Sequence, residues 1–123
     1  MRRPLADLLA DAAGLVTLGI GTALTVAPTR AGGVLGLPPS PAAARVIGGI
    51  DLGLGAGLLA GRPRWPWMAA RAAFNVVLGA RYLGEARRPG GNSRAMGGAV
   101  GMAALTVLDG VGAVALWRRA ARA

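Results

Sequence analysis

The chain alternates between long apolar segments and short polar ones rich in Pro, Gly and Arg. Each apolar segment has about the 20 residues that a helix needs to cross a bilayer. The four segments are residues 8–28, 42–61, 67–86 and 94–117. This pattern predicts an all-α protein, in which residues 1–123 form one transmembrane domain that folds as an integral-membrane four-helix bundle.

Composition supports a membrane location. Hydrophobic residues make up 54% of the chain and charged residues 15%, whereas a soluble domain usually carries about 25% charged residues. The 21 glycines are typical of close-packed membrane helices. A signal peptide is the alternative for the first segment, but two acids, Asp7 and Asp11, precede its uncharged part, and Pro28 follows the only small-residue cleavage position, Ala27. We therefore expect a true span.

The second segment presents two different faces. One face carries glycines at every fourth residue, namely Gly49, Gly53, Gly57 and Gly61. Overlapping GxxxG steps of this kind let another helix approach closely, so this stripe predicts helix packing. Asp51 lies on the other face, with Gly48 and Gly55 beside it, and we expect it to face a tightly packed neighbour rather than lipid.

Several polar residues fall inside the predicted spans at a similar depth. Arg71, Asn75 and Tyr82 share one stripe of the third segment, with Tyr82 nearer the far end. Counting about 1.5 Å per residue along spans that alternate in direction predicts a shared layer. The members of this layer are Asp11, Asp51, Arg71, Asn75 and Asp109.

Charges at this depth cost about 2.5–3.5 kcal/mol each, so they should face one another inside the bundle. Arg71 is the natural counter-ion, because its planar guanidinium can bridge two carboxylates. With three acids to one arginine, at least one carboxylate should lack a full partner, which favours its protonated form in an apolar setting. The sequence does not decide which one.

Two interpretations of this layer stay open. Polar residues can simply hold membrane helices together, in which case the layer should be dry and fully paired. Alternatively, a cavity touching Asp51 would indicate a binding or proton-handling site. In a catalytic version, Asp51 and Asp109 are the candidate general acids and Arg71 orients them. The remaining candidate ligand-binding residues are Asp11, Asn75 and Tyr82.

Several chemistries are excluded or unsupported. Neither His nor Cys is present, so no metal site, thiol chemistry or disulfide is predicted, and no cofactor either. The G-x-G in the second segment follows no strand, so it is not a dinucleotide loop. The net charge is +9, but the few aromatic residues provide no platform for nucleic-acid bases.

An even number of spans places both termini on one side of the membrane. Trp65, Trp67 and Trp117 fall at that same interface, as in an aromatic belt. Its arginines are Arg2, Arg3, Arg62, Arg64, Arg118, Arg119 and Arg122, and those opposite are Arg30, Arg45, Arg87, Arg88 and Arg94. The excess favours both termini in the cytoplasm and the chain in a cell inner membrane.

The chain also contains a weak internal repeat. The segment Asp11–Gly19, DAAGLVTLG, resembles Arg71–Gly79, RAAFNVVLG, and Asp51 and Asp109 share glycine-rich surroundings at a similar offset. This similarity is the basis for a duplicated helical hairpin as the origin of the bundle.

Three stretches carry a resemblance to a known family: LTVAPTRAGGVLGLP at Leu24–Pro38, RVIGGIDLGLGAGLL at Arg45–Leu59, and VLDGVGAV at Val107–Val114. In this order they resemble small four-span bacterial membrane proteins of the DoxX-like type, most of them of unknown function. The resemblance implies a four-helix membrane bundle. Some members are similar to subunits that work beside quinone-linked oxidoreductases, which implies an isoprenoid or quinone-like ligand. Arg71 and Asn75 depart from the family pattern.

We therefore expect a membrane protein that uses the Asp51 layer to bind an amphipathic, isoprenoid- or quinone-like small molecule or a partner membrane subunit. A membrane-embedded acid–base enzyme, such as a cyclase, an isomerase or an epoxide-opening catalyst, is one alternative. A purely structural subunit, or a homo-oligomer formed through the glycine stripe, is the other.

Overall fold

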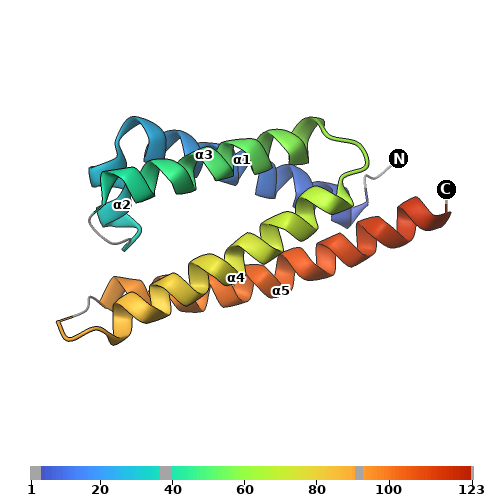
Figure 1. The fold of residues 1–123 in the computed structure, drawn as a ribbon. Helices are drawn as coiled ribbons and strands as arrows, with labels where there is room; N and C mark the ends of the chain where they lie inside the picture. Colours follow the sequence, from blue (N-terminus) through green and yellow to red (C-terminus); the bar gives the residue numbers. More distant parts are fainter. Residues whose placement is uncertain (1–3, 37–39, 91–92, 123) are drawn as a thin grey trace.

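The computed structural model describes residues 4–36, 40–90 and 93–122, and within these ranges it is all-helical, which confirms the all-α prediction. The helices are α1 (Leu5–Val26), α2 (Pro28–Val34), α3 (Pro41–Ala60), α4 (Trp65–Arg87) and α5 (Ser93–Arg122). Figure 1 shows two layers, with α1, α2 and α3 above α4 and α5. The two termini lie at the same end of the molecule.

Proline and a polar cap set the helix starts. Pro28 and Pro41 each occupy the first turn of a helix, where a missing N–H costs little. The side chain of Ser40 accepts a hydrogen bond from the Ala43 amide at 3.2 Å, which caps α3. Gly36 has a φ of +74°, which lets the chain turn after α2 at no steric cost.

The helix α2 lies in a stretch that the Gly and Pro content predicts to be a loop. It forms because Pro28 suits a first helical turn and because the short helix packs against the rest of the chain. Ala31 and Leu35 contact the core cluster that contains Leu24, and Gly32 is buried. The segment therefore folds back against the other helices.

The four long helices pair two by two. The helix α1 packs along α3, and α4 packs along α5, whereas contacts between the two pairs are sparse. The fold therefore consists of two helical hairpins, with α2 in the connection of the first (Figure 1). Each hairpin joins the helices that the repeat hypothesis assigns to one unit, and the duplication itself stays a prediction.

Glycines make the α1–α3 contact close. A Cβ added at Gly21 would lie 2.8 Å from the carbonyl oxygen of Gly48, and one at Gly55 would lie 3.0 Å from the carbonyl oxygen of Gly14. The backbones can therefore approach only because side chains are absent. This is the face of α3 that carries Asp51, and its tightly packed neighbour is α1.

The predicted glycine stripe on the opposite face of α3 is divided. Gly57 and Gly61 face the indole of Trp67 on α4. In the described part of the chain, nothing lies within 4 Å of a Cβ built at Gly49 or Gly53. Within one chain, the close neighbour expected along the whole stripe is therefore found only at one end of it.

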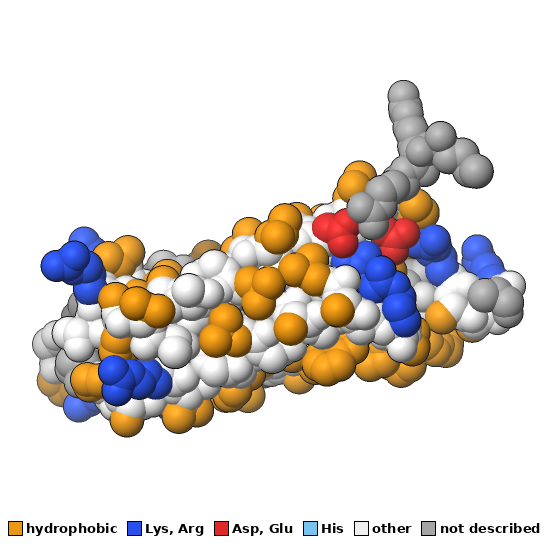
Figure 2. All heavy atoms as spheres, turned by 90° about the horizontal axis from the view of Figure 1, so that it is seen from above, with side chains coloured by type: hydrophobic (Ala, Val, Ile, Leu, Met, Phe, Trp, Pro, Cys, Tyr) orange, Lys and Arg blue, Asp and Glu red, His pale blue; other side chains and the backbone are white. Residues whose placement is uncertain are grey.

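The surface is suited to lipid. Three helices, α1, α3 and α5, are long and apolar enough to cross a membrane, whereas α4 is as long but more polar. Figure 2 shows arginines gathered towards both ends of an elongated body, with hydrophobic side chains along the length between them. Exposed apolar surface of this extent is unusual for a soluble monomer and suggests contact with a lipid bilayer. Large examples are Leu15, Val16, Val76, Val77, Val107 and Val111.

Candidate functional site

A buried carboxylate on α5 organises the polar layer. Asp109 is 1% exposed, and one of its oxygens, Oδ2, accepts hydrogen bonds from two side chains of α4. Arg71 donates through Nη1 and also forms an ion pair with it. Asn75, one helical turn further, donates through Nδ2 at 2.6 Å. Charge-assisted hydrogen bonds of this kind are strong, so they hold α4 against α5.

Arg71 also links the two hairpins. Its Nε donates a hydrogen bond to the hydroxyl oxygen of Thr17 on α1 at 2.8 Å. Thr17 is buried, and the sequence does not single it out. A threonine inside a membrane helix usually bonds the carbonyl one turn earlier, as Thr22 and Thr25 do here, so the residue type carries no signal of a long-range partner.

Asp51 on α3 differs from Asp109. It is only 8% exposed, yet no hydrogen bond or ion pair to its side chain is present among the described residues. The sequence predicts that at least one of three carboxylates lacks a full partner, and Asp51 fits that description. Burying a carboxyl group without a hydrogen-bond partner is costly in either protonation state, so the position favours water or a hydrogen-bonding guest molecule beside it.

A cavity of about 110 Å³ lies between the two hairpins and touches Asp51. Its polar wall consists of Thr17, Asp51, Arg71, Asn75 and Tyr82. Its apolar wall consists of Val16, Ile20, Leu24, Leu35, Ile47, Leu78, Met102 and Leu105. Sites for drug-sized ligands measure about 300–1,000 Å³, so this cavity fits several waters or the polar end of a larger molecule.

The cavity wall has hydrogen-bonding groups to spare. Arg71 uses Nε and Nη1 for Thr17 and Asp109, and Nη2 makes no hydrogen bond within the described residues. The Tyr82 hydroxyl is likewise unpaired there, although the residue is buried. Every completely inaccessible polar side-chain atom of the described residues has a hydrogen-bond partner. Arg71 Nη2, the Tyr82 hydroxyl and the Asp51 carboxylate have none among these residues, so they must be partly accessible. The cavity thus offers both donors and an acceptor.

Cavity-lining residues on α1 and α5 lie close to the surface. Val16 lines it and is 55% exposed, while Met102 and Leu105 on the facing helix are partly buried. The helices α1 and α5 contact each other sparsely, and the line between them is called the α1–α5 seam below. A molecule with an apolar tail could therefore occupy the cavity with its tail directed outward along the seam.

Four of the five residues predicted to share a layer are brought together: Asp51, Arg71, Asn75 and Asp109 line the cavity or support its wall. Tyr82, expected nearer the far end, lines the same cavity. Asp11 lies elsewhere, which corrects its predicted position. It is only six residues from the start of α1, whereas Thr17, six residues further along the helix, is the α1 residue at the level of Arg71.

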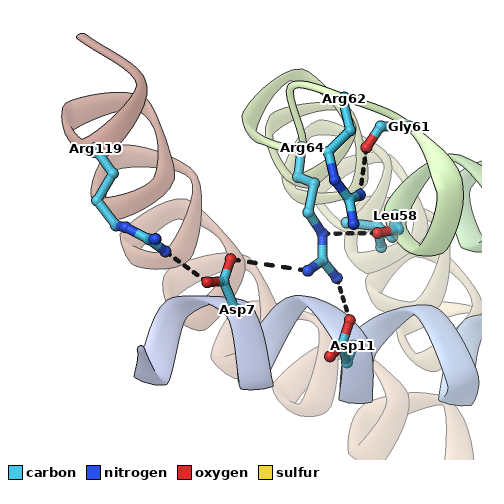
Figure 3. A network of polar contacts seen from close by, with 7 residues as sticks. All are labelled: Asp7, Asp11, Leu58, Gly61, Arg62, Arg64 and Arg119. Atoms are coloured by element: carbon cyan, nitrogen blue, oxygen red, sulfur yellow. Dashed lines mark hydrogen bonds and ion pairs between the residues drawn. The ribbon is translucent and has the colours of Figure 1, made fainter. Parts of the chain in front are cut away.

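Asp11 belongs to a second polar cluster near the chain ends (Figure 3). Arg64, 7% exposed, bonds Asp11 Oδ1 through Nη2 at 2.6 Å and the Leu58 carbonyl through Nε at 2.8 Å. Oδ1 of Asp7 lies 3.8 Å from Nη1 of Arg64, and Oδ2 of Asp7 accepts a hydrogen bond from Nη1 of Arg119 at 2.7 Å. The cluster joins α1, the α3–α4 turn and α5.

One feature of the sequence could have indicated the role of Arg64. Asp7 and Asp11 lie one turn apart at the start of an apolar segment, and two carboxylates on one face need a counter-ion at that end. Arg64 lies in a short turn at the same end, but its position in the sequence is typical of any arginine at a membrane interface. Only the folded turn shows that its side chain points inward, between the two acids (Figure 3).

The described residues contain no group of three or more acidic, His or Cys side chains placed to hold a metal ion. Comparison of the chain with protein-family models, with curated proteins and with solved structures finds no match. The resemblance to DoxX-like proteins therefore stays a prediction.

Proposed function

We propose that this chain is a multi-pass membrane protein whose cavity beside Asp51 binds the polar end of an amphipathic, isoprenoid- or quinone-like molecule. The observation that carries this proposal is a buried carboxylate without a partner among the described residues, placed on the wall of a cavity. The four spans of the bundle are α1, α3, α4 and α5.

The polar helix α4 is compatible with a fourth span because its polar side chains face inward. Arg71, Asn75 and Tyr82 are buried, whereas Val76 and Val77 are exposed. With 23 residues the helix is about 34 Å long, enough for a hydrocarbon core of about 30 Å. Arg81 is exposed six residues before the end of α4, close enough for its guanidinium to reach the interface.

The proposed location is a bacterial inner membrane with both termini in the cytoplasm. It is supported by the arginine excess and the three tryptophans at the end that carries the termini. Two of the counted arginines, Arg2 and Arg3, lie outside the described residues. The bacterial setting follows from the resemblance alone.

The wall groups define the chemistry of the ligand. The Asp51 carboxylate pairs with a hydroxyl or N–H group, and Nη2 of Arg71 donates to a carbonyl or ether oxygen. A polar end that combines a donor and an acceptor within one ring therefore satisfies both. The aliphatic wall and the α1–α5 seam suit an apolar tail that continues into lipid.

Native mass spectrometry of protein extracted with its lipids tests this proposal. The wild type should retain a specific small molecule, and Asp51→Ala should lose it. Asp7→Asn is the matched control, because it neutralises an acid outside the cavity and should retain the molecule. Equal retention by the Asp51 variant and the wild type, or no bound molecule in either, contradicts a binding role.

The open glycine face supports a second candidate function, that of a structural subunit. Gly49 and Gly53 offer an unoccupied surface on which another copy of the chain could pack. In that account, Gly53→Leu dissociates an oligomer and Asp51→Asn changes nothing. Cross-linking in native membranes distinguishes this outcome from the ligand-binding proposal.

The enzyme alternative narrows to one carboxylate. Oδ2 of Asp109 accepts hydrogen bonds from Arg71 and Asn75, and Asp109 does not line the cavity, which favours Asp51 over Asp109 as the general acid acting on a bound molecule. Conversion of the co-purified molecule by the wild type, but not by Asp51→Asn, would favour this alternative.

A further inference from the structure

A second pocket lies at the end of the molecule that carries the termini, where the two hairpins meet. Its volume is about 420 Å³, and three arginines, Arg62, Arg64 and Arg119, line it together with Asp7. Pro63 and Leu116 add an apolar part to the wall. The pocket is therefore amphipathic and distinct from the cavity at Asp51.

The arginines of this pocket are not equally engaged. Arg64 is fixed by Asp7, Asp11 and the Leu58 carbonyl, and Arg119 bonds Asp7. Arg62 bonds only the carbonyl of its neighbour, Gly61, and has no carboxylate partner among the described residues. Three guanidinium groups surround the single carboxylate on the wall, so the pocket has an excess of positive charge.

The pocket lies at the level of the lipid headgroups if the helices cross the membrane as proposed above. Trp117 on α5 and Trp67 on α4, which begins directly after the α3–α4 turn, are exposed, and tryptophan of this kind marks the membrane–water interface. The phosphate of a lipid at this depth would lie against the guanidinium groups, and the glycerol ester region of the lipid would lie against the apolar wall.

We propose that this pocket binds the phosphate group of an anionic phospholipid, with Arg62 and Arg119 as its contacts. Guanidinium groups suit phosphate because they donate two parallel hydrogen bonds, and basic pockets between membrane helices bind acidic headgroups. Asp7 opposes the phosphate, but its charge is compensated by Arg64 and Arg119. The bound lipid would bridge the α3–α4 turn and α5 and so hold the two hairpins together.

The test measures lipid binding to the full chain in neutral detergent, by native mass spectrometry and thermal unfolding, with phosphatidylglycerol as the probe. Arg62→Gln should weaken binding about tenfold, as expected for the loss of a charged hydrogen bond. Arg122→Gln removes the same charge at the same end but outside the pocket, and it should bind like the wild type. Arg62→Lys, which keeps the charge but loses the fork, should give an intermediate affinity.

Three results would overturn the proposal. These are an equal loss in the Arg62 and Arg122 variants, equal stabilisation by phosphatidylcholine, and full stabilisation by inorganic phosphate at the same concentration. The last identifies a free anion as the ligand. Asp51→Asn should retain phosphatidylglycerol while losing the cavity ligand, so failure of either site is seen separately. If the chain does not partition into membranes at all, the membrane placement is wrong and this proposal falls with it.

Discussion

Asp109 and Asp51 are two carboxylates of one polar layer for which we predict opposite responses to the same substitution. Asp109→Asn removes the charge that compensates buried Arg71 and weakens two interhelical hydrogen bonds. Asp51→Asn removes no hydrogen bond or ion pair that the described residues make. The substitution is the same at both positions, and both positions lie inside a helix, so each variant serves as the control for the other.

The magnitude follows from the partners that each residue has. An interhelical hydrogen bond in a membrane protein contributes about 0.6–1.7 kcal/mol. Removing one member of a buried ion pair costs more, about 3–5 kcal/mol, because a charge stays buried without its partner. We expect Asp109→Asn to lower the free energy of unfolding by about 3 kcal/mol, roughly 150-fold in the equilibrium constant. Asp51→Asn should change it by less than about 1 kcal/mol.

The assay is equilibrium unfolding in mixed micelles, with increasing SDS and helicity as the readout. The double variant Arg71→Leu/Asp109→Leu provides a further check, because replacing a whole buried ion pair by apolar side chains should recover much of the loss. Equal destabilisation by the Asp51 and Asp109 variants would refute the division of the layer into a paired part and an open part.

Three further predictions can be checked in the same unfolding assay. Thr17→Val removes the hydroxyl that accepts a hydrogen bond from Arg71, so it should cost about 1 kcal/mol, whereas Thr17→Ser should be nearly neutral. Gly21→Ala places a methyl group 2.8 Å from a backbone oxygen of α3 and should cost about 1–3 kcal/mol, whereas Gly53→Ala points into open space and should not destabilise. Arg64→Gln removes a buried guanidinium that bonds Asp11 and the Leu58 carbonyl, and it should cost about 2 kcal/mol. A neutral result at Thr17, at Gly21 or at Arg64 would contradict the contact concerned.

The helices and the inward-facing polar residues could be predicted because both follow from the sequence pattern alone. Apolar segments separated by Gly and Pro determine where helices begin and end. The cost of charge in an apolar setting predicts that Arg71 meets acidic side chains. Which acid it meets depends on how each helix is rotated about its axis, and no single-sequence pattern fixes that rotation. Asp109 therefore emerges as the partner, and Asp51 as the unpaired carboxylate, only in the folded chain.

The incorrect position of Asp11 has a similar cause. Counting residues predicts its depth to within a turn or two, and a turn is about 5.4 Å, enough to move a side chain from one polar cluster to another. Arg64, in the turn before α4, forms the hydrogen bond with Asp11 that the sequence predicts for Arg71. Short-range signals also missed α2, because glycine disfavours an isolated helix, whereas packing against the core cluster stabilises this one.

Thiol labelling tests most directly whether Asp51 faces an open cavity that a guest molecule fills. The chain has no Cys, so Asp51→Cys and Asp109→Cys each introduce a single thiol. We predict that a small methanethiosulfonate reagent modifies position 51, and does so more slowly in preparations that retain the co-purified molecule, while position 109 stays unreactive in the folded protein. Equal reactivity at the two positions, or no reaction at position 51 in protein stripped of small molecules, would contradict the account.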